Sequence, residues 1–116
     1  MKLTSLRDVR ALLDARGIRP SKALGQNFLH DANLIEWIVA LADVGPGDEV
    51  LEVGPGLGGL TEALARRAGR VVAVETDRRL LEVLAERTAD LPNLERVHGD
   101  ALKTDFDAWF GTRPWK

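Results

Sequence analysis

Apolar residues in the first part of the chain recur three and four positions apart, which is the spacing of a helix with one buried face. Leu6, Val9, Leu12 and Leu13 follow this spacing, and Gly17 stands where a helix of this kind ends. Glycine is common just past a helix because it adopts the left-handed conformation that terminates one. The pattern predicts a first helix that ends near Gly17.

A second helix is predicted after Asp31, whose side chain is of the type that caps helix N-termini. Residues 18–30 lack periodicity and predict a loop, while residues 45–48, Gly-Pro-Gly-Asp, predict a turn. We expect the buried face of the second helix to consist of Leu34, Ile35, Ile38, Val39 and Ala42.

The pattern changes at residue 49, where short apolar runs begin to alternate with helical segments. Strands are predicted at Glu49–Val53, Arg70–Glu75 and Leu94–His98, with helices at Leu60–Ala68 and after the capping residue Asp77. This alternation is typical of βαβ units in an α/β fold with a parallel sheet. Right-handed crossovers would order the strands 3-2-1, with helices on both faces and an unpaired edge on the first strand.

Composition limits the classes of protein that fit. The chain has 116 residues and no cysteine, so it is one domain at most, without disulfides or thiolate metal sites, and we expect no bound metal. Its longest apolar run is six residues, Trp37–Ala42, far below the ~20 that cross a bilayer. With no export leader in view, we expect a cytoplasmic protein without membrane contact.

Charge is distributed unevenly along the chain. Residues 1–30 hold six basic and two acidic residues, a net charge of +4, whereas the remaining 86 hold ten basic and sixteen acidic ones, a net charge of −6. A basic segment on an acidic body is typical of a contact with nucleic-acid phosphates, although a solvated arginine-rich helix has the same composition. The candidate RNA-binding residues are Arg7, Arg10, Arg16, Arg19 and Lys22.

A glycine-rich turn directly follows the first predicted strand. Residues 52–59 read Glu-Val-Gly-Pro-Gly-Leu-Gly-Gly, and Glu75 ends the next predicted strand, 21 positions after Gly54. Glycines allow positive φ angles and let a ligand approach the backbone, and a carboxylate at the second strand can accept two ribose hydroxyls. These features indicate a nucleoside-cofactor site, but the glycine spacing fits both dinucleotides and S-adenosylmethionine (SAM).

Three further features favour SAM over a nicotinamide cofactor. Glu52 lies two residues before the first glycine, where many methyltransferases have an acid. Asp100 follows the third strand, where a carboxylate can accept from an adenine amino group, although Asp100 could instead cap the segment after it. The segment Gly25–Leu29, Gly-Gln-Asn-Phe-Leu, precedes the sheet.

Together with residues 52–58 and the Glu75-x-Asp77 pair, this last segment resembles the ribosomal RNA adenine N6,N6-dimethyltransferases, most closely the KsgA-like branch that acts on small-subunit RNA. The resemblance covers about Leu24 to Asp100. It implies a Rossmann-like SAM-dependent methyltransferase fold and dimethylation of two adjacent adenosines of 16S RNA in the immature small ribosomal subunit. The SAM contacts it implies are Asn27, Leu29, Gly54, Gly56, Glu75 and Asp100.

The same resemblance implies that part of the enzyme is absent. In the family an Asn-Leu-Pro-Tyr motif orients and stacks the target adenine, and this motif does not occur in the 116 residues. We therefore expect no catalytic residue here and an inactive chain. Residues 1–44 would form a basic helical segment, and residues 45–116 the first half of a SAM-binding domain, completed by the rest of the protein or by another copy.

Two other functions remain open from the sequence. A nicotinamide-dependent oxidoreductase half-domain would use the same glycines and Glu75, but it leaves residues 26–29 and Asp100 unexplained. A non-catalytic RNA-binding module would use only the basic N-terminal residues.

Overall fold

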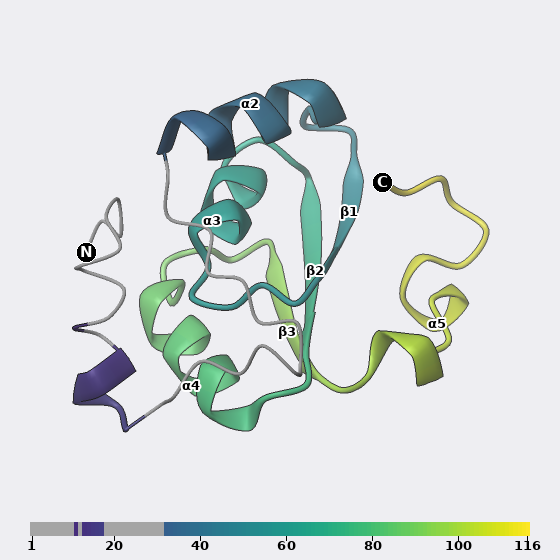
Figure 1. Ribbon diagram of the computed structural model, residues 1–116. Helices are drawn as coiled ribbons and strands as arrows, with labels where there is room; N and C mark the ends of the chain where they lie inside the picture. Colours follow the sequence, from purple (N-terminus) through teal and green to yellow (C-terminus); the bar gives the residue numbers. More distant parts are fainter. Residues whose placement is uncertain (1–10, 12, 18–31) are drawn as a thin grey trace.

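The computed structural model describes residues 11, 13–17 and 32–116. Its centre is a three-stranded parallel sheet of β1 (Glu49–Val53), β2 (Arg70–Glu75) and β3 (Leu94–His98), in the order β1-β2-β3 (Figure 1). The strand bounds and their order confirm the sequence prediction. Residues 11 and 13–15 are helical, and Gly17 has a φ of 63°, as expected of a glycine that ends a helix.

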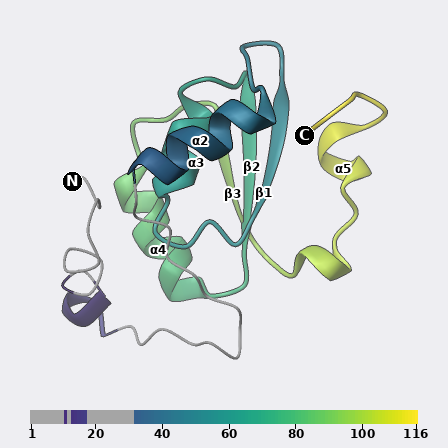
Figure 2. The same ribbon diagram turned by 45° about the horizontal axis from the view of Figure 1, so that its top comes forward.

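Helical segments cover both faces of the sheet, as predicted. On one face lie α2 (Ala32–Ala42), α3 (Gly59–Ala65) and α4 (Arg78–Arg87). The other face is covered by the chain that follows β3, with the 3-10 helix η2 (Ala101–Lys103) and α5 (Asp107–Phe110) (Figures 1 and 2). Covering both faces is what a parallel sheet requires, because both of its surfaces are apolar.

The side chains of β2 alternate between these two layers. Val71 and Ala73 belong to the core beneath α2, α3 and α4, whereas Val72 and Val74 pack with Phe110 of α5 on the opposite face. All four β2 side chains are almost completely buried. This two-sided burial explains why β2 reads as an unbroken apolar run.

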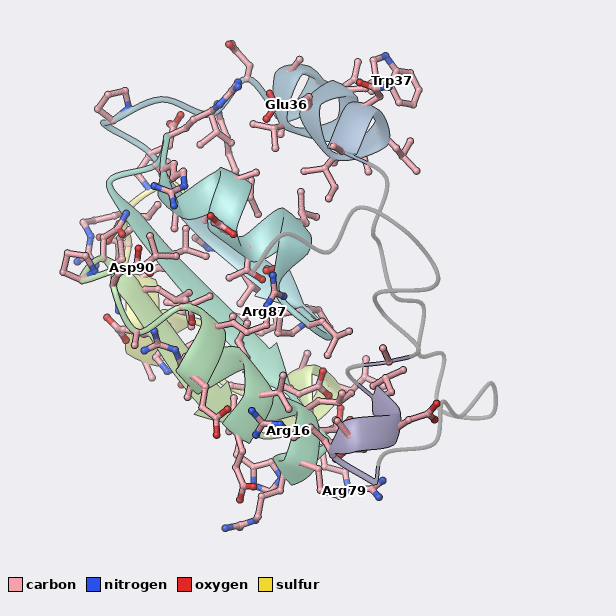
Figure 3. The ribbon with its side chains drawn as sticks, turned by 90° about the vertical axis from the view of Figure 1, so that its left-hand side faces the viewer. Arg16, Glu36, Trp37, Arg79, Arg87 and Asp90 are labelled. Carbon is pink, nitrogen blue, oxygen red and sulfur yellow. The ribbon has the colours of Figure 1, made fainter. Side chains whose placement is uncertain are left out.

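The buried face of α2 is narrower than predicted. Ile35 and Val39 are buried in the core, but Leu34 is 40% exposed and Ala42 is also exposed, so their predicted burial is wrong. Ile35 and Val39 are four residues apart and form a single stripe, because α2 lies at the margin of the helical layer. Trp37 projects outward from α2 (Figure 3).

Helix α3 is shorter than the predicted Leu60–Ala68, because it ends at Ala65 and the chain turns back toward β2. The free carbonyl groups at this end are satisfied from another loop: the Asn93 amide donates to the carbonyl oxygens of Ala65 at 2.8 Å and Ala68 at 3.0 Å. A helix end needs such partners, and here they come from a residue distant in sequence.

The outer edge of β1 is not unpaired, which corrects the sequence prediction. The Lys116 N–H donates to the Glu49 carbonyl at 2.9 Å, and the Leu51 N–H donates to the Lys116 carbonyl at 2.7 Å. This is the hydrogen-bond pattern of a parallel pair around Val50. Residue 116 therefore already occupies the position of a neighbouring strand.

Candidate functional site

Three loops meet at the carboxyl edge of the sheet. Beyond the paired strands, the Gly54 N–H donates to the Val74 carbonyl at 2.9 Å, and the Gly99 N–H donates to the Glu75 carbonyl at 3.0 Å. These bonds extend the ladder past β1 and β3, so Gly54, Glu75 and the Gly99-Asp100 pair lie on adjacent chains at one edge. In open α/β sheets, this edge is where ligands bind.

The turn between β1 and α3 has the backbone conformation that its glycines predict. The φ angles of Gly54, Gly56 and Gly58 are 69°, 58° and 90°, a region that other residues rarely adopt. A Cβ placed on Gly54 would meet no atom within 4 Å, whereas one on Gly58 would lie 2.6 Å from Leu84 Cδ1. Gly54 therefore faces open space that a ligand can occupy, and Gly58 is needed for packing.

The Glu75 carboxylate joins the glycine turn to the β2–α4 loop. Its Oε1 accepts from the Gly56 N–H at 3.3 Å, and its Oε2 accepts from the Asp77 N–H at 2.9 Å. Glu75 is only 4% exposed. The Thr76 hydroxyl is a third donor, 3.5 Å from Oε2. Because a carboxylate has about four acceptor positions, one is left for a ligand hydroxyl, and a second ligand hydroxyl would replace this long bond from Thr76.

Asp77 has the capping role that the sequence predicts. Its Oδ1 accepts from the backbone N–H groups of Arg79 at 2.9 Å and Leu80 at 3.4 Å, the first turn of α4. The two acids therefore have different positions: Asp77 caps the N-terminus of α4, and Glu75, the last residue of β2, faces the glycine turn.

Asp100 begins the 3-10 helix η2, since its Oδ1 accepts from the Leu102 N–H at 2.9 Å. Capping was the alternative left open for this residue. The segment after it consists of two short helices, η2 and α5. The bond uses one carboxylate oxygen, and a contact with adenine stays a prediction.

The sequence indicated Glu52 only as an acid of the kind that many methyltransferases have at this position. Its hydrogen bond to another element was not predicted. Its side chain is buried, with 8% of the residue exposed, and it accepts a hydrogen bond from the Thr61 hydroxyl of α3. Burial raises the pKa of Glu52 to about 7, and the nearby Glu75 charge adds to this, while the Thr61 hydrogen bond opposes it. A glutamate at an inward-facing strand position was the available signal.

Several predicted site residues cannot be placed. The SAM-contact candidates Asn27 and Leu29 lie outside the described residues, and so do the RNA-binding candidates Arg7, Arg10, Arg19 and Lys22. Arg16 is described: its Nη1 donates to Glu86 Oε1 of α4 at 3.0 Å, and it lies beside α4 in Figure 3. The Arg16 guanidinium therefore forms an ion pair within the protein, with Glu86.

The described residues lack two kinds of feature. Residues 11, 13–17 and 32–116 contain no cluster of three or more histidine and acidic side chains that could hold a metal ion. No helix in the same part of the chain has the length and apolar character needed to span a bilayer.

A positive-φ glycine turn, a buried carboxylate at the end of the next strand and a parallel sheet define a Rossmann-like fold with a nucleoside-cofactor site. Solved structures of methyltransferases match this fold, which places the chain in the SAM-dependent methyltransferase class. Residues 18–111 match the ribosomal RNA adenine dimethylase family, and the chain belongs to that family. The cofactor that family membership implies is SAM.

Individual relatives agree with this assignment. The chain is 55% identical over 97 residues to ribosomal RNA small subunit methyltransferase A of Moorella thermoacetica, an alignment that covers 84% of this chain and 34% of the relative. The chain spans about a third of the length of the first curated relatives that it matches.

Two solved structures have the same fold. The 23S rRNA methyltransferase ErmE matches with a TM-score of 0.65 and 43% identity, covering 68% of this chain and 32% of that one. A dimethyladenosine transferase from Plasmodium falciparum matches with a TM-score of 0.65 and 33% identity, covering 69% and 30%.

Proposed function

We propose that this chain is the SAM-binding part of an rRNA adenine N6,N6-dimethyltransferase that modifies two adjacent adenosines of small-subunit RNA. The observation that carries the proposal is the open space above Gly54, beside a buried Glu75 that is already fixed by two backbone N–H groups. The printed names of the sequence relatives, ribosomal RNA small subunit methyltransferase A, support the small subunit as the target.

The proposed roles of the residues follow from their chemistry. Gly54 and Gly56 let the cofactor approach the backbone, and the Glu75 carboxylate accepts both ribose hydroxyls. Asp100 accepts from the adenine amino group with the oxygen that does not cap η2. Asn27 and Leu29 contact the cofactor as the family pattern implies.

SAM supplies an electrophilic methyl group, and the protein contributes by positioning it near the acceptor nitrogen. The Asn-Leu-Pro-Tyr motif, which the family uses to hold the target adenine, is not among these 116 residues. We therefore infer that a chain of these residues alone binds SAM without transferring its methyl group. Methylation of immature small ribosomal subunits by this chain alone would contradict that inference.

The proposed RNA contact involves the basic N-terminal segment with Arg7, Arg10, Arg16, Arg19 and Lys22, in a protein that works in the cytoplasm. Each lysine or arginine that neutralises a phosphate makes the affinity depend more steeply on salt. Filter binding to 16S RNA over a salt series tests this contact: substitution of these residues is expected to reduce the slope, and an unchanged slope would contradict it.

Cofactor binding is tested by calorimetric titration with SAM and with NAD. The wild-type chain is expected to bind SAM in preference to NAD. Gly54→Ala would place a methyl group in the open space at a φ of 69°, and it is expected to weaken SAM binding at least about 10-fold.

Gly47→Ala controls for the added methyl group, because a Cβ at Gly47 also meets nothing within 4 Å and Gly47 lies in the turn before β1, away from the carboxyl edge. SAM affinity equal in the wild type and both variants would contradict the site, and tight NAD binding without SAM binding would replace the proposed function by the oxidoreductase alternative.

A further inference from the structure

Two buried carboxyl groups lie under the glycine turn. Glu52 pairs in register with Ala73, and Glu75 is two residues further along β2, so both side chains belong to the same face of neighbouring strands. That face is the one covered by α3, which carries Thr61, the hydrogen-bond donor to Glu52. Only 8% of Glu52 and 4% of Glu75 is exposed.

Of the two, Glu75 is the carboxylate that carries the charge. Each of its oxygens accepts from a backbone N–H, from Gly56 and from Asp77, and such donors stabilise the ionised form. Hydroxyl groups of a ribose are also donors, so the proposed ligand needs Glu75 ionised as well.

Among the described residues of α2, α3 and α4, the ion pairs that form leave out Glu52 and Glu75. On α3, Glu62 pairs with Arg66 at the surface, and on α2, Glu36 pairs with Arg67. Arg87 of α4 lies between the helices (Figure 3), and the carboxylate that acts on its pKa is Glu62.

Among the described residues, no ion pair joins Glu52 or Glu75 to a lysine or arginine. Two negative charges buried on the same face of neighbouring strands repel each other, which favours a proton on one of them.

We propose that Glu52 is a positioning residue of the cofactor site that works in its protonated form. The inference rests on the proposed function. The Glu52–Thr61 hydrogen bond ties the end of β1 to the first turn of α3, which are the two ends of the glycine turn. With Glu52 neutral, Glu75 alone is charged, and the turn keeps the shape in which Gly56 donates to it.

Loss of the Glu52 proton places a second negative charge under the turn. Repulsion from Glu75 then displaces one carboxylate, and either movement disturbs a bond that shapes the site: Thr61 to Glu52, or Gly56 to Glu75. Burial and the Glu75 charge set the pKa of Glu52 at about 7, so this loss falls in the neutral range of pH. Cofactor binding should weaken as pH rises through that range.

The test compares the wild-type chain with Glu52→Gln, because glutamine resembles a protonated glutamate that cannot ionise. The probe is S-adenosylhomocysteine (SAH), whose sulfur is uncharged, titrated by calorimetry at pH 6.5, 7.5 and 8.5. The wild-type Kd is expected to rise about 25-fold over this range, as for a site that binds only when a group of pKa about 7 is protonated. The Kd of Glu52→Gln is expected to match the wild type at pH 6.5 and to change less than about two-fold over the same range.

Glu62→Gln is the control, because Glu62 is an α3 carboxylate that is paired with Arg66 at the surface. The Kd of this variant for SAH should change with pH as the wild-type Kd does. Ionisation of the ligand amino group affects all three proteins equally, so it cannot produce a difference between them. A parallel titration with SAM distinguishes the opposite role. If the ionised Glu52 attracts the sulfonium charge, wild-type SAM binding tightens with pH while SAH binding does not, and the inference is overturned.

The failures of this inference and of the proposed function are distinguishable. Wild-type binding with a pH profile equal to that of Glu52→Gln overturns the positioning role and leaves the SAM site intact. Absence of SAM and SAH binding by the wild type at every pH overturns the proposed function, and this inference with it.

Discussion

At the scale of single residues, the glycines of the β1–α3 turn serve different purposes although they share positive φ angles. Gly54 borders open space, whereas Gly58 contacts α4 so closely that a Cβ would overlap Leu84. The shared spacing of the motif therefore includes one position that borders open space and one that is needed for packing. Substitutions at the two positions should separate binding from stability.

Gly58→Ala is expected to destabilise the protein by about 2–4 kcal/mol. The added methyl group would lie 2.6 Å from Leu84 Cδ1, and alanine is strained at a φ of 90°. Chemical denaturation measures the change. Gly47→Ala, where the added Cβ meets nothing, should stay within about 1 kcal/mol of the wild type. Equal stability of the two variants would show that α3 and α4 are not packed at Gly58.

Glu52 should also make the stability of the protein depend on pH without any ligand. Its pKa is about 7 in the folded chain against an unfolded value of 4.5, so the folded state binds the proton more tightly. The stabilisation from this proton is fully present below pH 4.5 and is lost as pH rises to about 7. The loss amounts to about 3 kcal/mol, an order-of-magnitude figure for a shift of this size.

Glu52→Gln removes this dependence and keeps an acceptor for Thr61. Its free energy of unfolding should equal that of the wild type near pH 4.5 and exceed it by up to about 3 kcal/mol at pH 8. Urea denaturation at the two pH values measures the difference. A constant difference between the two proteins across that range would mean that Glu52 is already ionised in the folded state.

At the scale of elements, the sequence was sufficient wherever a local pattern decides the structure. Residues 71–74 of β2 are buried on both faces and read as an unbroken apolar run, and the alternation of strands and helices allows only a few topologies. The same holds for Asp77, because a capping residue acts on the backbone two and three positions away. The glycine turn and Glu75 belong to this group, since their spacing follows from one βαβ unit.

The elements that were predicted incorrectly depend on partners distant in sequence. Helix α3 ends at Ala65, where Asn93, 28 residues later, donates to the Ala65 carbonyl. Helix α2 buries only the stripe of Ile35 and Val39, because it lies at the margin of the helical layer. The periodicity of its own sequence does not encode that position. The Glu52–Thr61 bond was missed for a different reason: the two residues are only nine positions apart, but they lie on different elements, and no local pattern specifies a contact between β1 and α3.

At the scale of the whole molecule, the amino edge of the sheet, where the strands begin, and the carboxyl edge, where they end, differ in the contacts that cover them. At the amino edge, Arg70 donates to Glu95, to Glu49 and to the carbonyl of Trp109, at distances of 2.8, 3.2 and 2.6 Å. Arg113 adds a bond to Glu49 at 2.8 Å. These contacts fasten the C-terminal layer at the end of the sheet that is opposite to the glycine turn. The carboxyl edge is left for the ligand.

The aromatic side chains of this C-terminal layer bind it to the sheet. Phe110 is fully buried against Val72 and Val74, and Trp115 stacks on Phe110 with ring centroids 5.2 Å apart. The layer thus carries the chain from β3 across the sheet to β1, where Lys116 pairs with Glu49 and Leu51. A parallel neighbour for β1 begins where this crossing ends.

The Lys116 pairing can be tested through one amide. The Leu51 N–H donates to Lys116, whereas the Glu52 N–H faces β2, because successive N–H groups alternate along a strand and Gly54 donates to Val74. Removal of residues 114–116 should therefore speed hydrogen exchange at Leu51 at least about 10-fold relative to Glu52. Lys116→Ala keeps the backbone and should leave Leu51 protected. If Leu51 exchanges equally fast in the wild type, the chain does not pair along β1, and completion of this edge depends wholly on another segment or another copy.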